Sequence, residues 1–174
     1  MELRQVRLSD PIIAPLLAGL TAEYEHRYGA DGEMALAHPD EFDPPTGAFV
    51  VLLDDDQTVA GGGIRRLENE TCEVKRMWTS PEYRRRGLAS TVLTALEDVG
   101  RQLGYTRVRL ETGPSQPEAI AMYGHLGYRT IPPFGPYQDA VAFERDLAPR
   151  RPLIGGGHSV LTLIFHPRWS QGCD

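Results

Sequence analysis

The sequence is poor in cysteine, with only Cys72 and Cys173 among its 174 residues. Their positions indicate neither a metal site nor a disulfide framework, because no further cysteine or patterned histidine accompanies them. Disulfides are rare in reducing compartments, where such isolated thiols stay free. We therefore expect two unpaired thiols and no bound metal.

A long apolar run is also lacking. No segment approaches the roughly 20 apolar residues needed to cross a bilayer. The first ten residues, MELRQVRLSD, contain no apolar core of the kind found in secretory signals. Hydrophobic residues make up 41% and charged residues 24%, so the composition is that of an ordinary globular domain. We expect a cytoplasmic protein without a membrane partner.

Basic residues are in deficit, since 18 Lys and Arg stand against 24 Asp and Glu, for a formal net charge of −6. Nucleic-acid-binding domains are usually basic, so this balance argues against a nucleic-acid partner. A negative field favours cationic small molecules over anionic ones, although many acidic proteins carry such charge only for solubility.

Hydrophobic periodicity predicts an α/β domain over residues 1–147. Ser9 or Asp10 is expected to cap a first helical region that ends near Gly29. A polar loop with at most one helical turn should follow over 31–47, and helices are expected over 88–103 and from 117 to about 127. Strands are expected over 3–8, 48–53, 59–67, 72–79, 106–112, 128–131 and 140–147.

Two segments depart from this regular pattern. Three consecutive glycines, Gly61–Gly63, fall inside an expected strand, where glycine is unfavourable, so they predict a bulge or a close backbone approach. After Leu147 the composition changes to prolines, a triple glycine and one apolar stretch over 160–165. We expect residues 148–174 to form a disordered or weakly docked tail.

The strongest functional signal is the basic turn from Arg84 to Ala89, RRRGLA, which joins an expected strand to an expected helix. The first N–H groups of a helix lack intrahelical partners, and the helix dipole makes that end positive. Gly87 lets the backbone approach a bulky anion, and the arginines add charge-assisted hydrogen bonds. The turn therefore predicts a diphosphate site, and the alternative is a solvated basic turn. It is neither a Walker phosphate loop nor a Rossmann glycine motif.

This turn resembles the acetyl-CoA signature [QR]-x-x-G-x-[GA] of the GNAT acetyltransferase superfamily, with Arg84, Gly87 and Ala89 at the fixed positions. The resemblance implies a GNAT fold, with a mixed central β-sheet, helices on both faces, and two splayed parallel strands over 72–79 and 106–112. Acetyl-CoA would lie between those strands. Further residues match the preceding strand and a later helix block: Met77, Thr79, Pro81, Ala119, Tyr123, Gly127 and Tyr128.

The resemblance implies an N-acetyltransferase that uses acetyl-CoA as co-substrate. The acetyl group would pass directly to a primary amine through a tetrahedral intermediate, without a covalent enzyme intermediate. A small or amino-acid-like acceptor is favoured over a protein lysine or N-terminus. The alternative is a non-catalytic CoA-binding regulatory module. Homodimers are common in the family, so a homodimer stays open for this chain.

The resemblance also assigns residues to acetyl-CoA. The backbone of Met77, Trp78 and Thr79 would pair with the pantetheine arm, and one of those N–H groups would polarise the acetyl carbonyl. Gln116 stands where the family commonly has an asparagine that contacts the arm, and it offers the same amide on a longer stem. The diphosphate would bind the turn residues Arg84, Arg85, Arg86, Gly87, Leu88, Ala89 and Ser90.

Two residues are candidates for the proton transfers. Tyr123 takes the position of the family's general acid, which protonates the leaving thiolate of CoA; the alternative is a tyrosine with its ring in the core. Glu73 takes the position of a catalytic glutamate and is the candidate general base, because an amine must lose a proton. Its alternative is a solvent-facing glutamate paired with Lys75 or Arg65. Glu111 or ordered water could replace it.

In the family, two segments line the acceptor. One is the first helical region with the loop that follows it, and the other is the loop before the last strand. Aromatic rings and carboxylates there could hold an ammonium group through cation–π and charge contacts. The alternative is ordinary surface residues. The residues concerned are Tyr24, Tyr28, Glu41, Asp43, Phe134 and Tyr137.

Overall fold

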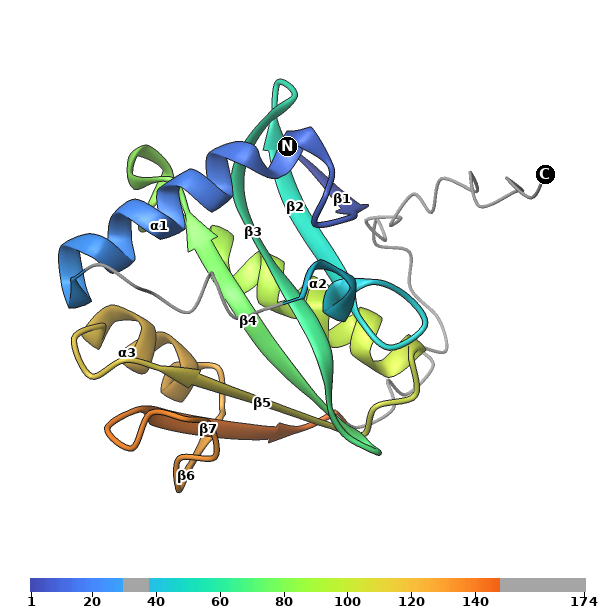
Figure 1. Ribbon diagram of the computed structural model, residues 1–174, viewed down its shortest axis with the longest axis vertical. Helices are drawn as coiled ribbons and strands as arrows, with labels where there is room; N and C mark the ends of the chain where they lie inside the picture. Colours follow the sequence, from blue (N-terminus) through green and yellow to red (C-terminus); the bar gives the residue numbers. More distant parts are fainter. Residues whose placement is uncertain (30–37, 148–174) are drawn as a thin grey trace, which may run out of the picture.

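The computed structural model describes residues 1–29 and 38–147, which form one layer of sheet between helices (Figure 1). The sheet has seven strands in the order β1-β2-β3-β4-β5-β7-β6. The helices are α1 (Ala14–Tyr28), α2 (Leu88–Gln102) and α3 (Pro117–His125), with short 3-10 turns η1 (Pro11–Ile13), η3 (Pro39–Phe42) and η4 (Pro81–Tyr83). The strands are β1 (Glu2–Val6), β2 (Ala48–Asp54), β3 (Gln57–Glu68), β4 (Thr71–Thr79), β5 (Arg107–Thr112), β6 (Arg129–Ile131) and β7 (Val141–Asp146).

The element order predicted from the sequence is confirmed, and the bounds agree closely. Of the two expected caps of the first helical region, Ser9 and Asp10, it is Asp10 whose Oδ1 accepts from the Ile12 N–H, at 3.0 Å. Gly29 ends α1 with a φ of 82°, as expected. No helix within residues 1–29 and 38–147 is long and apolar enough to cross a membrane. The expected tail, and Cys173 within it, lie outside the described residues.

The sheet separates two cores because successive side chains of a strand point to opposite faces. On β2, Ala48, Val50 and Leu52 pack toward α2. Phe49 and Val51 pack on the other side, against α1. In Figure 1, α1 crosses the face in view and α2 lies behind the sheet. The expected helices on both faces are confirmed.

The parallel ladder between β4 and β5 is short. It pairs Thr71 with Arg107 and ends where Val74 pairs with Leu110. Both strands continue, β4 to Thr79 and β5 to Thr112, while β5 keeps its pairing with β7. The two strands therefore splay beyond Val74, as the family resemblance implied, and the edge of β4 that faces β5 is left without strand partners there.

A bulge between β3 and β4 lies beside the start of the splay. Gly61 pairs with Trp78 and Gly63 with Lys75, so the register shifts between them, and Arg76 takes a positive φ of 58°. The bulge predicted from the glycine run is confirmed. A bulge increases the local twist of its strand, and this one lies just beyond the last pair of β4 with β5.

Close packing explains why the run consists of glycines. A Cβ on Gly63 would lie 2.5 Å from the Phe42 ring and 2.7 Å from the Phe49 ring. A Cβ on Gly62 would lie 2.5 Å from the Met77 sulfur. The side chains of other segments thus occupy the space that larger residues on β3 would need.

A cluster of charges ties β5, β6 and β7 together. Glu144 lies on β7 with its side chain only 6% exposed, and its carboxylate contacts Arg109 at 2.6 Å and Arg129 at 2.5 Å. Arg107 lies 3.6 Å from the same group. Burial alone would raise the pKa of Glu144, but the hydrogen bonds from Arg129 and Arg109 outweigh it and hold that pKa below its usual value.

We predict that Gly63→Ala destabilises the protein by about 1–3 kcal/mol, because the added methyl group overpacks the contact with two aromatic rings. Urea unfolding followed by circular dichroism measures this. Gly124→Ala is the control, since nothing lies within 4 Å of its added Cβ in α3. That change should instead stabilise by up to about 1 kcal/mol through helix propensity. Equal free energies of unfolding for Gly63→Ala and the wild type would contradict the packing argument.

We predict that Glu144→Gln lowers the free energy of unfolding by about 1–3 kcal/mol at pH 7, because three arginines lose their shared anion. A lowered folded-state pKa means that the stabilisation is present above the unfolded pKa of about 4.3 and is lost as the pH falls through the folded value. The difference between wild type and variant should therefore shrink below pH 4. Denaturation at pH 7, 5 and 3 tests this, and a constant difference would contradict it.

Candidate functional site

The turn before α2 presents unpaired backbone donors. Gly87 caps the helix at a φ of 77°, with no side-chain capping bond. Within the described part of the chain, the N–H groups of residues 87–90 have no protein acceptor. Leu88 is buried in the core below and fixes the turn, and a Cβ at position 87 would meet nothing within 4 Å. The arrangement suits an anion on the positive end of α2.

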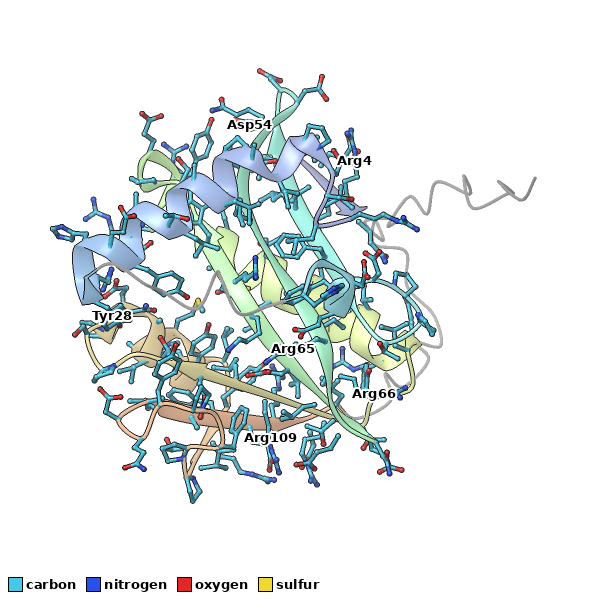
Figure 2. The ribbon with its side chains drawn as sticks, in the orientation of Figure 1. Arg4, Tyr28, Asp54, Arg65, Arg66 and Arg109 are labelled. Atoms are coloured by element: carbon cyan, nitrogen blue, oxygen red, sulfur yellow. The ribbon has the colours of Figure 1, made fainter. Side chains whose placement is uncertain are left out.

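The arginines of the turn point in different directions. Arg86 lies over the Tyr83 ring at 4.9 Å, and the Tyr83 hydroxyl donates to Asp54 at 2.9 Å. Asp54, labelled in Figure 2, stands at the end of β2. The Arg84 guanidinium instead pairs with Glu23 of α1 at 2.9 Å. The Arg84 backbone N–H donates to the Pro81 carbonyl oxygen at 3.4 Å, so both its backbone and its guanidinium already have protein partners, while Arg86 is held beside the turn.

The open edge of β4 continues this donor surface. Met77, Trp78 and Thr79 lie beyond the last residue paired with β5, so their edge toward β5 has no strand partner. The Trp78 indole packs under α1, where a Cβ on Gly19 would come within 2.4 Å of it. The Thr79 hydroxyl oxygen is buried and has no hydrogen-bond partner. An extended ligand with amides could pair along this edge as an added strand.

Tyr123 projects from α3 into the same core that α2 covers. It is 5% exposed, and its ring lies 5.8 Å from that of Tyr128 and 5.5 Å from that of Phe143. Burial raises the pKa of Tyr123 well above its ordinary value, so the phenol keeps its proton.

A buried network behind Tyr123 was missed by the sequence analysis. The Tyr128 hydroxyl donates to Glu97 of α2 at 2.8 Å, and Arg145 Nη1 donates to the same carboxylate at 3.1 Å. Arg101 reaches the second oxygen of Glu97 at 3.4 Å. The available signal was an acidic residue at a position of α2 that helical periodicity places on the apolar face.

Glu73 lies on the opposite face of β4 from this core. Its side chain is only 3% exposed and contacts Arg65 at 2.9 Å and Lys75 at 3.4 Å. Arg65, labelled in Figure 2, also pairs with Glu41. Of the alternatives that the sequence left open, the ion pairs with both cations are present, but the carboxylate is buried and does not face solvent. Its role as general base stays a prediction.

Glu111 and Gln116 make local contacts at the end of β5. Glu111 Oε1 accepts from the backbone N–H groups of Phe134 at 2.7 Å and Gly135 at 3.0 Å, which fixes the loop before β7. Gln116 caps α3, and its Oε1 accepts from the Thr112 hydroxyl at 2.8 Å. The amide nitrogen of Gln116 is then the group left to meet a ligand.

The expected acceptor-lining residues divide between two walls. The Tyr24 and Tyr28 rings lie 6.2 Å apart on α1, and Figure 2 shows Tyr28 at the end of that helix. The Phe134 ring lies 5.8 Å below Arg109. Both expected carboxylates are bound to arginines, Glu41 to Arg65 and Asp43 to Arg7. An ammonium group would have to compete with a guanidinium for either one.

The structure thus places the predicted residues on the two faces of the sheet, around the splay of β4 and β5. The diphosphate turn and Tyr123 belong to the side of α2 and α3, whereas Glu73 belongs to the side of α1. The open edge of Met77–Thr79 lies between them. No group of three or more potential metal ligands occurs within residues 1–29 and 38–147.

Comparisons with known proteins show what the chain is similar to. The model of the acetyltransferase (GNAT) family matches residues 15–128. The chain is 34% identical over 139 residues to the uncharacterized N-acetyltransferase YjgM of Escherichia coli (strain K12). The matched segment covers 74% of this chain and 82% of that protein. This similarity extends well beyond the two short motifs.

Solved structures show the same fold. An acetyltransferase of the GNAT family from Staphylococcus aureus Mu50 superposes with a TM-score of 0.71 at 16% identity, covering 83% of this chain and 99% of that chain. An aminoglycoside 6′-N-acetyltransferase complexed with coenzyme A gives a TM-score of 0.65 at 15% identity, covering 87% and 99%. At these identities the likeness concerns the fold alone.

We predict that Tyr123 does not ionise below pH 11, because its burial disfavours the phenolate. Ultraviolet titration of the wild type and Tyr123→Phe measures this. The two titration curves should coincide up to that pH, since the missing tyrosine contributes no phenolate absorbance. A wild-type curve that contains one more group titrating near pH 10 would contradict the prediction.

Proposed function

Because the chain belongs to the acetyltransferase (GNAT) family, we propose that it transfers an acetyl group from acetyl-CoA directly to a primary amine. The acceptor is a small or amino-acid-like molecule, and the reaction takes place in the cytoplasm. The observation that carries the proposal is the row of unpaired N–H groups at residues 87–90 beside the unpaired edge of β4. Acetyl-CoA supplies an acetyl group activated as a thioester.

The residues present fit CoA. The N–H groups of residues 87–90 bind the diphosphate, supported by the helix dipole and by Arg86. The edge of Met77–Thr79 pairs with the amides of the pantetheine arm. The buried Thr79 hydroxyl, which has no protein partner, supports this assignment because buried polar groups are normally hydrogen-bonded. Gln116 offers its amide nitrogen from the other wall.

The chemistry then follows from the two sides of the opening. Acetyl-CoA, the acetyl donor, occupies the side of α2, so the amine approaches from the side of α1. A backbone N–H on the open edge of β4 polarises the acetyl carbonyl as the tetrahedral intermediate forms. Tyr123 is protonated at neutral pH and donates its proton to the sulfur that leaves. Acid and nucleophile act from opposite faces.

The amine must also lose a proton. Glu73 lies on the face from which the amine approaches, but its two ion pairs must loosen before it accepts one. Glu111 is occupied by two backbone N–H groups in the same way. An ordered water that accepts the proton and passes it to bulk solvent leaves the contacts of both carboxylates in place, and we propose this route.

We predict that Tyr123→Phe lowers kcat by about 100-fold, because the leaving thiolate loses its proton donor. The dissociation constant of CoA should change less than about twofold, since the ring remains. Release of free CoA across a panel of amine acceptors, with calorimetry for binding, measures both. Tyr105→Phe is the control, because it removes another buried tyrosine hydroxyl, bonded at 2.7 Å to the Thr46 carbonyl oxygen. Unchanged kcat in Tyr123→Phe would reject the assignment.

The same experiments separate the alternative function, a non-catalytic CoA-binding regulatory module. Such a module would bind CoA but release none with any acceptor. Direct transfer further requires both substrates on the enzyme together, so double-reciprocal plots should intersect. Parallel lines, or an isolable acetyl-enzyme, would contradict direct transfer while leaving the family assignment in place.

A further inference from the structure

A continuous chain of ion pairs runs along one side of α1 and reaches two other parts of the fold. Glu23 on α1 contacts Arg84 at 2.9 Å through one carboxylate oxygen and Arg27 at 2.9 Å through the other. Arg27, one turn further along, contacts Glu118 at 2.6 Å and donates to the Ser115 carbonyl oxygen at 2.5 Å. Glu23 and Arg84 are 61 positions apart in the sequence, and Arg27 and Glu118 are 91 positions apart.

The two ends of this chain belong to opposite walls of the splay. Arg84 Nε donates to the carbonyl oxygen of Thr79, the last residue of β4, at 3.3 Å. Ser115 follows β5 and directly precedes Gln116, the cap of α3. Figure 1 shows the end of α1 above α3, and the close approach of Tyr28 to Gly113 agrees with this. The helix α1 therefore bridges the walls between which the proposed pantetheine arm lies.

We propose that Glu23 and Arg27 are positioning residues that fix the separation of these walls and so the fit of the pantetheine arm. The inference rests on the proposed function, because the slot is the one assigned to CoA. Glu23 and Arg27 are partly buried, with 23% and 18% of their side chains exposed, so their mutual pair is less screened than an isolated surface pair. The outer partners Arg84 and Glu118 are more exposed, at 41% and 62%. A charge network with shared partners also resists stretching more than its separate pairs would.

A simpler account of the same contacts predicts the opposite result. If Glu23 only neutralised Arg84, its removal would free a guanidinium beside the diphosphate site and strengthen CoA binding. If Glu23 holds the walls, its removal weakens the binding of the pantetheine arm. The sign of the change in affinity therefore distinguishes the two accounts.

The experiment compares two ligands by calorimetry on the full-length protein. CoA contains the pantetheine arm, and 3′-phosphoadenosine 5′-diphosphate is the part of CoA that remains without it. The variants are Glu23→Gln and Arg27→Met. The control is Glu25→Gln, the same substitution and charge change at an exposed position of the same helix. Thermal melting verifies that each variant is folded.

We expect the dissociation constant of CoA to rise about tenfold in Glu23→Gln and Arg27→Met, and that of the diphosphate fragment to change less than twofold. Glu25→Gln should bind both ligands like the wild type. Unchanged or tighter CoA binding in Glu23→Gln would overturn the inference, as would equal weakening of both ligands. Failure of the wild type to bind CoA would instead refute the proposed function itself.

Discussion

The end of the parallel ladder at Val74 and Leu110 is the constraint on which the rest of this structure depends. Beyond it, β5 turns with β7 while β4 stays with β3, so one strand edge faces an opening with its hydrogen-bonding groups unpaired. Such an edge invites an extended partner. The N-terminus of α2 opens beside it, which combines a strand-like surface with an anion site.

Packing on β3 maintains this separation. The bulge opposite Gly61–Gly63 twists β4, and the contacts of Phe42 and Met77 against those glycines leave no room for the strand to relax. Trp78 then packs under Gly19 of α1, so the helix follows the twisted end of β4. In this account, β4 and β5 are held apart by the packing of β4 on β3 and α1, and by the ion pairs that Glu23 and Arg27 of α1 make with the segments that follow β4 and β5.

Local sequence signals predicted the elements, the bulge and the anion turn, because periodicity, glycine and the start of a helix act over a few residues. The family resemblance supplied the splay. Contacts between distant residues could not be predicted, since they depend on register and on the direction of each side chain. Arg84 matched the motif, yet its guanidinium bonds Glu23 on α1. Glu73, the candidate base for which a solvent-facing glutamate was the alternative, is buried between Arg65 and Lys75.

The most direct test concerns the backbone N–H groups of residues 87–90, observed by nuclear magnetic resonance on isotopically labelled protein during titration with CoA. Hydrogen bonds to a diphosphate should shift these resonances strongly and slow their exchange with solvent. The N–H of Gly104, already bonded at 3.1 Å to the Arg101 carbonyl oxygen at the far end of α2, should change little. Saturating CoA that leaves residues 87–90 unaffected would contradict the account.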